Sequence, residues 1–120
     1  MQKGSSSSVR IFYPSFNKEE LVKKLKEKIR DLALELPLSL AVLFGSYAQG
    51  KNTVASDVDV LIVYEGEERR NAYVTVKKTM NIPLLEPHVY SENEYERLRK
   101  VIDHMVEGGV VLYSRRNSAK

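Results

Sequence analysis

Apolar residues recur every three or four positions in two stretches of the chain, which predicts two amphipathic helices. In the first stretch, lysines and glutamates separate an apolar stripe formed by Leu21, Val22, Leu25, Ile29, Leu32 and Leu36. Asn17 and Glu20 have the form of a capping box, in which each side chain accepts a hydrogen bond from the other residue's backbone amide. Pro37 is expected to end this helix, because proline cannot continue a helical hydrogen-bond pattern.

The second stretch begins with another capping box, formed by Ser91 and Glu94. Its apolar stripe, which we expect to be buried, consists of Tyr95, Leu98, Val101, Ile102 and Met105. The helix is expected to end at Gly108 and Gly109, because the left-handed conformation that closes a helix costs glycine little.

Runs of β-branched and aliphatic residues predict the strands of one sheet. Two runs are nearly continuous, Leu38–Phe44 and Val58–Val63, and are typical of buried strands. A third strand, Ile82–Tyr90, contains two prolines that cannot donate to a ladder, so we place it at a sheet edge. Val110–Tyr113 is a short closing strand, and Val9–Tyr13 is a short extended segment. The small and polar residues 47–56 predict one helical turn and a loop.

Residues 67–80 fit two conformations. Ala72, Val76 and Met80 have helical spacing, whereas Tyr73–Val76 alone would pass for a strand. We favour a helix, because two parallel strands need a crossover between them and this segment supplies one. The alternating order of strands and helices then predicts an α/β fold, a small mixed β-sheet with helices packed on one face.

Composition agrees with one small domain and bears on its ligands. The chain has 120 residues, 42% of them hydrophobic, and we expect a flexible arm at residues 1–8 followed by one domain at residues 9–120. It contains no cysteine and no apolar run near the ~20 residues that cross a bilayer, so we expect a cytoplasmic protein without membrane contact. The net charge of +3 suits an anionic ligand such as a nucleotide but is too small to argue for duplex nucleic acid.

A Gly-Ser pair, Gly45 and Ser46, ends the first buried strand and opens the helical turn. Backbone N–H groups at such a position are unpaired, and together with a hydroxyl they can hold a phosphate. Gly-Ser pairs also end strands as ordinary turns. The pair alone therefore leaves both interpretations open.

Two aspartates follow at the start of the second buried strand. Ten residues separate Ser46 from Asp57, and Asp59 lies two positions further on. Side chains two apart on a strand project from one face, and carboxylates this close repel each other unless a cation lies between them. Hard oxygen ligands at this spacing suit Mg²⁺. The alternative is a pair of solvated aspartates; metal binding is favoured because Asp59 lies inside the β-branched run, where an unpaired charge is costly.

Together these features resemble the signature of the polymerase-β-like nucleotidyltransferase superfamily, which is Gly-Ser, a short interval, and Asp-x-Asp in a hydrophobic strand. The local sequence FGSYAQGKNTVASDVDVLIV, residues 44–63, is most similar to the minimal stand-alone nucleotidyltransferases. That branch is familiar as the antitoxin (MNT) half of the HEPN–MNT toxin–antitoxin pairs. The resemblance implies the nucleotidyltransferase fold and transfer of a nucleotidyl group from Mg²⁺-bound nucleoside triphosphate.

The resemblance also assigns roles to individual residues. In the family the Gly-Ser turn holds the β- and γ-phosphates, which implies this role for Gly45 and Ser46. Two aspartates and a third carboxylate from a neighbouring strand bind two Mg²⁺ ions, and the third carboxylate can deprotonate the acceptor hydroxyl. The matching residues of this chain are Asp57, Asp59 and Glu86, which we expect to be both metal ligands and catalytic residues. In-line attack on the α-phosphorus then releases pyrophosphate.

Some positions depart from the family's pattern. The third acid in many relatives is aspartate, whereas this chain has Glu86. If Glu86 is not a metal ligand, the alternative is a solvated side chain on an exposed sheet edge. His88 shares a face with Glu86 and either touches the phosphates or the acceptor, or only lines that face. Many minimal members have arginine where this chain has Gln49. Lys51 is the candidate to supply the missing charge to the phosphates, although a loop lysine is usually solvated.

The resemblance implies ATP as the donor and a partner protein as the acceptor, because we see no second domain like those with which larger relatives bind their acceptors. In the toxin–antitoxin relatives the acceptor is a tyrosine of the HEPN toxin, so AMPylation of such a partner is the first hypothesis. The second hypothesis is a non-catalytic module that neutralises or scaffolds a partner by docking. Nucleic-acid binding is a third, supported only by the basic charge. The sequence leaves the oligomeric state open.

Overall fold

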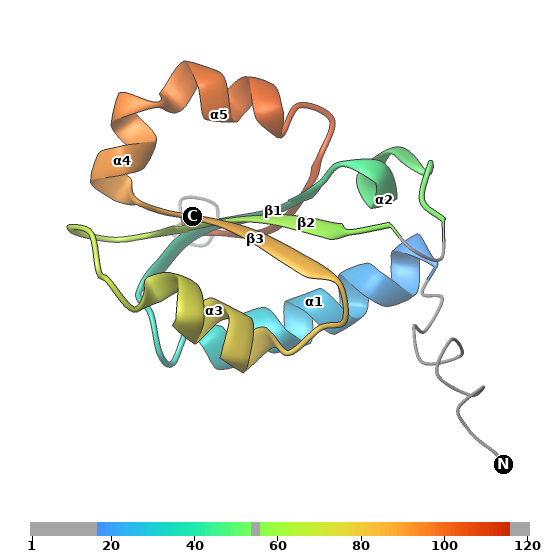
Figure 1. Ribbon diagram of the computed structural model, residues 1–120, viewed down its shortest axis with the longest axis horizontal. Helices are drawn as coiled ribbons and strands as arrows, with labels where there is room; N and C mark the ends of the chain where they lie inside the picture. The colour runs from blue at the N-terminus through green and yellow to red at the C-terminus, as the bar shows by residue number, and fades with distance from the viewer. Residues whose placement is uncertain (1–16, 54–55, 116–120) are drawn as a thin grey trace, which may run out of the picture.

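The structure is a computed structural model that describes residues 17–53 and 56–115 (Figure 1). Along these residues the elements are α1 (Lys18–Leu32), β1 (Leu38–Phe44), α2 (Ser46–Gln49), β2 (Val58–Tyr64), α3 (Ala72–Met80), β3 (Leu85–Ser91), α4 (Glu92–Arg97), α5 (Arg99–Met105) and β4 (Val110–Ser114). The arm expected at residues 1–8 and the extended segment expected at residues 9–13 lie outside the described residues.

The strands of the described chain form one sheet in the order β3-β2-β1-β4. β1 is antiparallel to both of its neighbours, β2 and β4, whereas β2 and β3 are parallel. The parallel pair is connected through α3, which confirms the helical interpretation of that segment. β3 lies at a sheet edge, as its prolines predicted. The predicted α/β class with a small mixed sheet is confirmed.

Helices occupy both faces of this sheet rather than the single face expected (Figure 1). α1 and α3 cover one face, where Val58, Val60 and Ile62 of β2 join the larger apolar core. α4 and α5 cover part of the other face, where Leu61 and Ile102 belong to a second, smaller core. The physical reason is that β1 and β2 are apolar on both sides, and each apolar face of a sheet has to be covered.

Several elements differ from the predicted boundaries by a few residues. α1 ends at Leu32, and a turn in which the Leu36 amide donates to the Leu32 carbonyl, 2.9 Å away, leads into Pro37. α3 begins at Ala72, five residues later than expected. β3 begins at Leu85 rather than Ile82, because Leu84 has a φ of 63°, which no strand accommodates.

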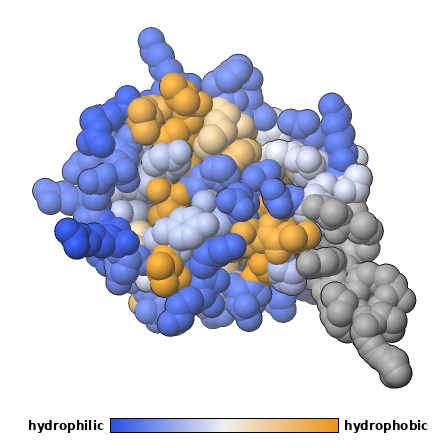
Figure 2. All heavy atoms as spheres, viewed as in Figure 1, coloured by the Kyte–Doolittle hydropathy of each residue, from blue (hydrophilic) through white to orange (hydrophobic). Residues whose placement is uncertain are grey.

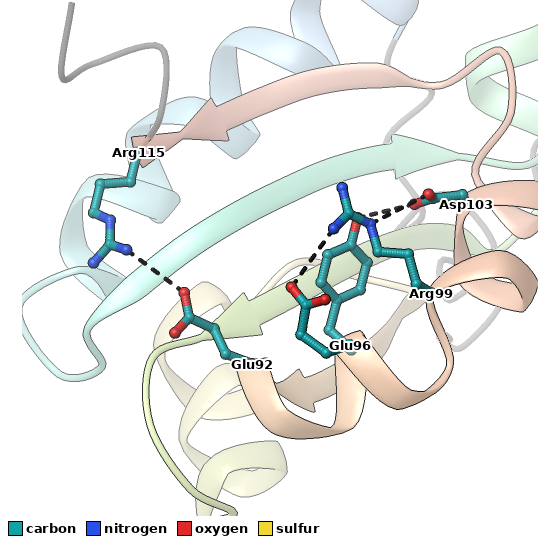
Figure 3. Close-up of polar contacts among 6 residues, drawn as sticks. Glu92, Glu96, Arg99, Asp103 and Arg115 are labelled. Carbon is teal, nitrogen blue, oxygen red and sulfur yellow. Dashed lines mark hydrogen bonds and ion pairs between the residues drawn. The ribbon is translucent and has the colours of Figure 1, made fainter.

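The helix predicted after Ser91 is divided at Leu98, where φ is −108° and ψ is 18°. Because the break divides the helix, the predicted apolar stripe does not form one buried face, and the prediction that Leu98 and Val101 are buried is wrong: they are 42% and 67% exposed. Ile102 is buried as predicted. Arg99 fastens the two short helices together, because it forms ion pairs with Glu96 and Asp103 at 3.5 Å each (Figure 3).

Apolar atoms on the molecular face seen in Figure 2 form separate groups among polar ones rather than one continuous patch. Single exposed apolar side chains such as Leu34 are ordinary on protein surfaces. Within residues 17–53 and 56–115, every helix is too short or too polar to span a bilayer.

The capping box at the start of α4 joins this helix to the end of β3. Ser91 is fully buried, its hydroxyl accepts from the Glu94 amide at 3.1 Å, and its own amide donates to Glu94 Oε1 at 2.9 Å. The second of these bonds lowers the pKa of Glu94 below its usual value, because it stabilises the carboxylate. Both predicted capping boxes are thus present in the structure.

Replacing Ser91 with alanine is expected to lower the free energy of unfolding by about 1 kcal/mol, because the Glu94 amide in the first turn of α4 loses its acceptor. Urea denaturation of the variant beside wild type measures this difference. Asn93→Ala is the matched control, since Asn93 is exposed in the same helix and does not cap it. A loss no larger than that of the control would show that the box contributes nothing to stability.

Candidate functional site

The contact between Gly45 and Asp59 defines the centre of the site. Gly45 has φ 81° and ψ −153°, a conformation that is essentially restricted to glycine. A Cβ atom at this position would overlap Asp59 Oδ2 and lie 3.2 Å from the Asp59 Cγ. The α-carbon of the Gly-Ser turn therefore lies directly against the carboxylate of the second aspartate, so two motifs that are separated in the sequence meet in space.

Ser46 begins the short helix α2, which projects from the end of β1 (Figure 1). The helix is closed by Gly50 in the left-handed conformation, and the Lys51 amide donates to the Ser46 carbonyl at 2.9 Å. Tyr47 is buried beneath the turn and holds α2 against the main core. The serine is consequently fixed beside Gly45 at the start of a helical turn, where main-chain N–H groups have no partner within the helix.

The parallel pairing of β2 and β3 places the third predicted acid beside Asp59. Asp59 is directly paired with Glu86 in the ladder, and His88 is paired with Leu61 one step further along the same face. Paired residues on neighbouring strands project from the same face, and the strands lie about 4.8 Å apart. Asp59 and Glu86 therefore lie side by side on the same face of the sheet as α4 and α5.

His88 lines this face and contacts Asp59. Its Nε2 atom is 3.4 Å from Asp59 Oδ1, and its ring lies 5.0 Å from that of Phe44, with an angle of 60° between the ring planes. Asp59 and His88 are both half-buried, whereas Glu86 is exposed. One oxygen of Asp59 therefore faces the histidine and the other faces the Gly-Ser turn.

The remaining predicted residues lie at the margin of this arrangement. Asp57 is exposed and precedes the first residue of β2, so its direction is not fixed by the ladder. Gln49 and Lys51 are exposed at the end of α2 and just after it. The structure thus brings Gly45, Ser46, Asp59, Glu86 and His88 together and places the other three around them. Gln49 and Lys51 contact the turn through their main-chain amides, which donate to the Gly45 carbonyl at 3.1 Å and to the Ser46 carbonyl at 2.9 Å.

The carboxylates of Asp57, Asp59 and Glu86 suit a metal ion that binds together with a nucleotide. They are less suited to a metal ion that the protein would hold without one. Among the described residues, no three histidine, aspartate or glutamate side chains are close enough to form a ready-made metal site. Mg²⁺ is usually bound by one or two carboxylates plus substrate phosphates and water. Asp59 and Glu86, adjacent and on one face, meet that requirement, and Asp57 is two residues from Asp59.

Comparison with protein families identifies the fold that carries this site. The model of the nucleotidyltransferase domain matches residues 18–111, which include every site residue named above. This chain belongs to the nucleotidyltransferase domain family. The family confirms the resemblance that the Gly-Ser and Asp-x-Asp motifs indicated. No curated protein matches the sequence significantly.

Solved structures share the fold of this nucleotidyltransferase domain. An assigned nucleotidyltransferase from Sulfolobus solfataricus is 24% identical with a TM-score of 0.61, and the match covers 97% of this chain and 94% of that one. A toxin–antitoxin structure with AMP-PNP is 22% identical with a TM-score of 0.52 and coverages of 74% and 73%. A tri-AMPylated Shewanella oneidensis HEPN toxin in complex with its MNT antitoxin matches at 18% identity over 86% and 74% of the two chains, and its TM-score of 0.46 is too low to carry an argument.

A polar hollow lies at the end of the nucleotidyltransferase domain's sheet opposite the candidate site. It has a volume of about 220 Å³ and is lined by Ser39, Leu40, Glu92, Tyr95, Glu96, Arg99, Ser114 and Arg115. Its charged side chains form ion pairs: Arg115 lies 3.6 Å from Glu92, and Arg99 lies 3.5 Å from Glu96 (Figure 3). Arg115 also bonds Glu65, which lies outside the hollow. Because these groups satisfy each other, the hollow offers no unpaired charge to a nucleotide.

The sequence did not point to three residues that contact the site. Phe44 supports the His88 ring, Lys18 donates to the Ala48 carbonyl of α2 at 3.0 Å, and Lys77 donates to the Leu85 carbonyl beside Glu86 at 2.8 Å. Phe44 adjoins the Gly-Ser pair and could have been included on that ground. The two lysines resemble any exposed helical lysine in sequence, so no local pattern could have identified them.

Proposed function

We propose that this nucleotidyltransferase domain binds Mg²⁺ and a nucleoside triphosphate, with ATP as the favoured donor, and transfers the nucleotidyl group to a hydroxyl of a partner protein. The observation that carries the proposal is the contact of Gly45 with the Asp59 carboxylate, with Glu86 paired beside it. A phosphate held by the Gly-Ser turn would lie next to two carboxylates that suit a divalent cation.

The residues of the site divide between two tasks. The amides and hydroxyl of the turn at Gly45 and Ser46 bind the β- and γ-phosphates, and Lys51 adds positive charge at the rim. Asp57, Asp59 and Glu86 would supply oxygen ligands for two metal ions. When bound, these ions would neutralise the charge that develops on the α-phosphate and on the departing pyrophosphate.

The transfer itself is an exchange of one phosphorus–oxygen bond for another. The acceptor oxygen forms a bond to the α-phosphorus, the bond from that phosphorus to the bridging oxygen breaks, and pyrophosphate leaves with the bonding electron pair. Glu86 accepts the proton of the acceptor hydroxyl, a role that its exposed position on the edge strand permits. His88 holds one oxygen of Asp59 and so directs the other toward the turn.

The donor and the partner are supported by the family resemblance and by one structural relative. The sequence around the Gly-Ser turn resembles that of the MNT antitoxins, which modify a HEPN toxin. The toxin–antitoxin structure with AMP-PNP contains an analogue of ATP and has the same fold. We therefore propose a HEPN-type toxin as partner and AMP as the group transferred.

Titration calorimetry tests the nucleotide and metal part of the proposal. MgATP is expected to bind the wild-type protein, and the double variant Asp57→Asn/Asp59→Asn is expected to lose magnesium-dependent binding by at least about tenfold, because both charged ligands are gone. Asp31→Asn/Glu35→Gln is a control with the same change in charge, since both side chains are exposed at the end of α1 that lies away from α2. If wild type binds none of ATP, GTP, CTP and UTP in the presence of Mg²⁺, the proposal is overturned.

A second function is favoured by one observation. Gln49 and Glu86 stand where many relatives have arginine and aspartate, and such departures are expected of a module that keeps the fold without catalysis. Such a module would neutralise its partner by docking alone. In that case the double aspartate variant would protect cells that express the partner as well as wild type does, and loss of protection with folding intact would exclude it.

A further inference from the structure

We propose that Lys18 and Lys77 are positioning residues that hold the two halves of the site in place through main-chain carbonyls. Lys18 acts on the phosphate-binding turn, and Lys77 acts on the strand that carries Glu86. The inference rests on the proposed function for its consequences, but its geometric basis is independent of it. Both lysines come from the helix layer, α1 and α3, on the face of the sheet opposite the carboxylates.

Lys18 fastens α2 to the beginning of α1. Its Nζ atom donates to the Ala48 carbonyl at 3.0 Å across 30 positions of sequence, in a partly buried hydrogen bond. Within the described chain no main-chain amide donates to this carbonyl, since the amides that close α2 go to the carbonyls of residues 45–47. A helix of four residues has little stability of its own. The ammonium group also lies at the negative end of that helix, where a positive charge is favourable.

Lys77 fastens the start of β3 to the last turn of α3. Its Nζ atom donates to the Leu85 carbonyl at 2.8 Å. The neighbouring Leu84 carbonyl points the other way and accepts from the Val58 amide of β2, so Leu85 turns its carbonyl toward the open edge of the sheet. Without the lysine this carbonyl would have no partner from the ladder. The bond orients the peptide that leads into Glu86.

The need for such a support is greatest at this point of the chain. Leu84 has a φ of 63°, which is a genuine outlier for a large side chain, and Asn81 has a φ of 47°. Two left-handed residues within four positions reverse the chain immediately before the third carboxylate. Lys77 therefore stabilises the strained turn at its exit and sets the direction in which Glu86 meets Asp59.

The two roles predict different effects on nucleotide and metal binding, which can be measured without an acceptor. Lys18→Met, which keeps the apolar stem, is expected to weaken ATP binding at saturating Mg²⁺ about tenfold and to leave the half-saturating Mg²⁺ concentration unchanged. Lys77→Met is expected to raise the half-saturating Mg²⁺ concentration about tenfold and to leave ATP affinity at saturating Mg²⁺ unchanged. Lys18→Arg and Lys77→Arg should recover much of each loss, because arginine restores the charged donor.

Lys24→Met and Lys78→Met are matched controls on the same two helices, since the structure gives these lysines no hydrogen bond or ion pair with a described residue.

Amide NMR spectra supply a readout that does not depend on function: Lys18→Met should shift signals of residues 45–51, and Lys77→Met those of residues 84–88. Shifts confined to these segments, together with the two separate binding effects, support the proposal. Spectra like those of the controls overturn it, and so do local shifts with lowered melting temperature but unchanged ATP and Mg²⁺ binding. If wild type binds no MgATP, the proposed function fails, and the spectra alone decide whether the lysines hold the two segments.

Discussion

Asp59→Asn is expected to reduce transfer of label from the α-phosphate of ATP to a co-expressed HEPN-type partner by about a thousandfold, which corresponds to ~4 kcal/mol of transition-state stabilisation. The substitution keeps the shape of the side chain and its contact with His88, but it removes the charge that we assign to metal binding. Asp59 faces the Gly-Ser turn with one oxygen and stands beside Glu86, so no other carboxylate occupies its place.

Stability separates this role from a structural one. Because the charge of Asp59 is half-buried next to another carboxylate, its removal is expected to leave the melting temperature unchanged or to raise it. Asp31→Asn, on the exposed side of α1, is the control for loss of one negative charge and should transfer label at the wild-type rate. Wild-type transfer by Asp59→Asn would show that the residue has no catalytic role.

Gly45→Ala is the second substitution expected to have a large effect. The backbone of this residue is in a region open only to glycine, and forcing alanine into it costs about 1–3 kcal/mol. The new methyl group would also overlap Asp59 Oδ2, so either the carboxylate or the Gly-Ser turn has to move. A displacement of about 1 Å at a reacting group lowers rates about a hundredfold, and we expect at least that loss of transfer.

Gly66→Ala provides the comparison that isolates the contact from the strain. Gly66 has a φ of 90°, and a Cβ atom there would meet no neighbouring atom within 4 Å. Both variants should therefore lose stability in urea denaturation, whereas only Gly45→Ala should lose MgATP binding and transfer. Equal activity of the two variants would show that the contact between the turn and Asp59 has no functional importance.

The strands and the caps could be predicted from the sequence because their signals are local. A nearly continuous apolar run defines β1 to the residue, and two capping boxes begin their helices where the Asn17 and Ser91 patterns indicated. The break at Leu98 could not be predicted, because neither glycine nor proline marks it and the apolar spacing continues across it. Its cause is tertiary packing, because the two short helices cover the smaller apolar core that contains Leu61 and Ile102.

The site shows the same division between local and distant information. The family resemblance implied a third carboxylate on a strand next to Asp59, and the parallel pairing of β2 with β3 places Glu86 opposite Asp59. The spacing of Asp57 and Asp59 predicted that these two share a face, but Asp57 precedes β2, so the ladder does not fix its direction. The contact of Gly45 with Asp59 depends on the antiparallel pairing of β1 with β2, in which Phe44 lies opposite Asp59. No property of either segment alone specifies that register. The roles of Lys18 and Lys77 are even harder to predict. Each depends on one side chain that donates to a main-chain carbonyl of another element, and no sequence pattern marks such a bond.

The place of β4 in the sheet has a consequence for how the protein is made. The candidate site residues lie between positions 45 and 88, yet β1, which carries the Gly-Ser turn at its end, pairs on its second side with Val110–Ser114. During synthesis on the ribosome, the nascent chain therefore contains every candidate site residue while one edge of β1 is still unpaired. Gly109, whose α-carbon packs against the Leu43 carbonyl, has to leave the exit tunnel before that edge can close. The sheet that carries the candidate site is therefore complete only after β4 has emerged.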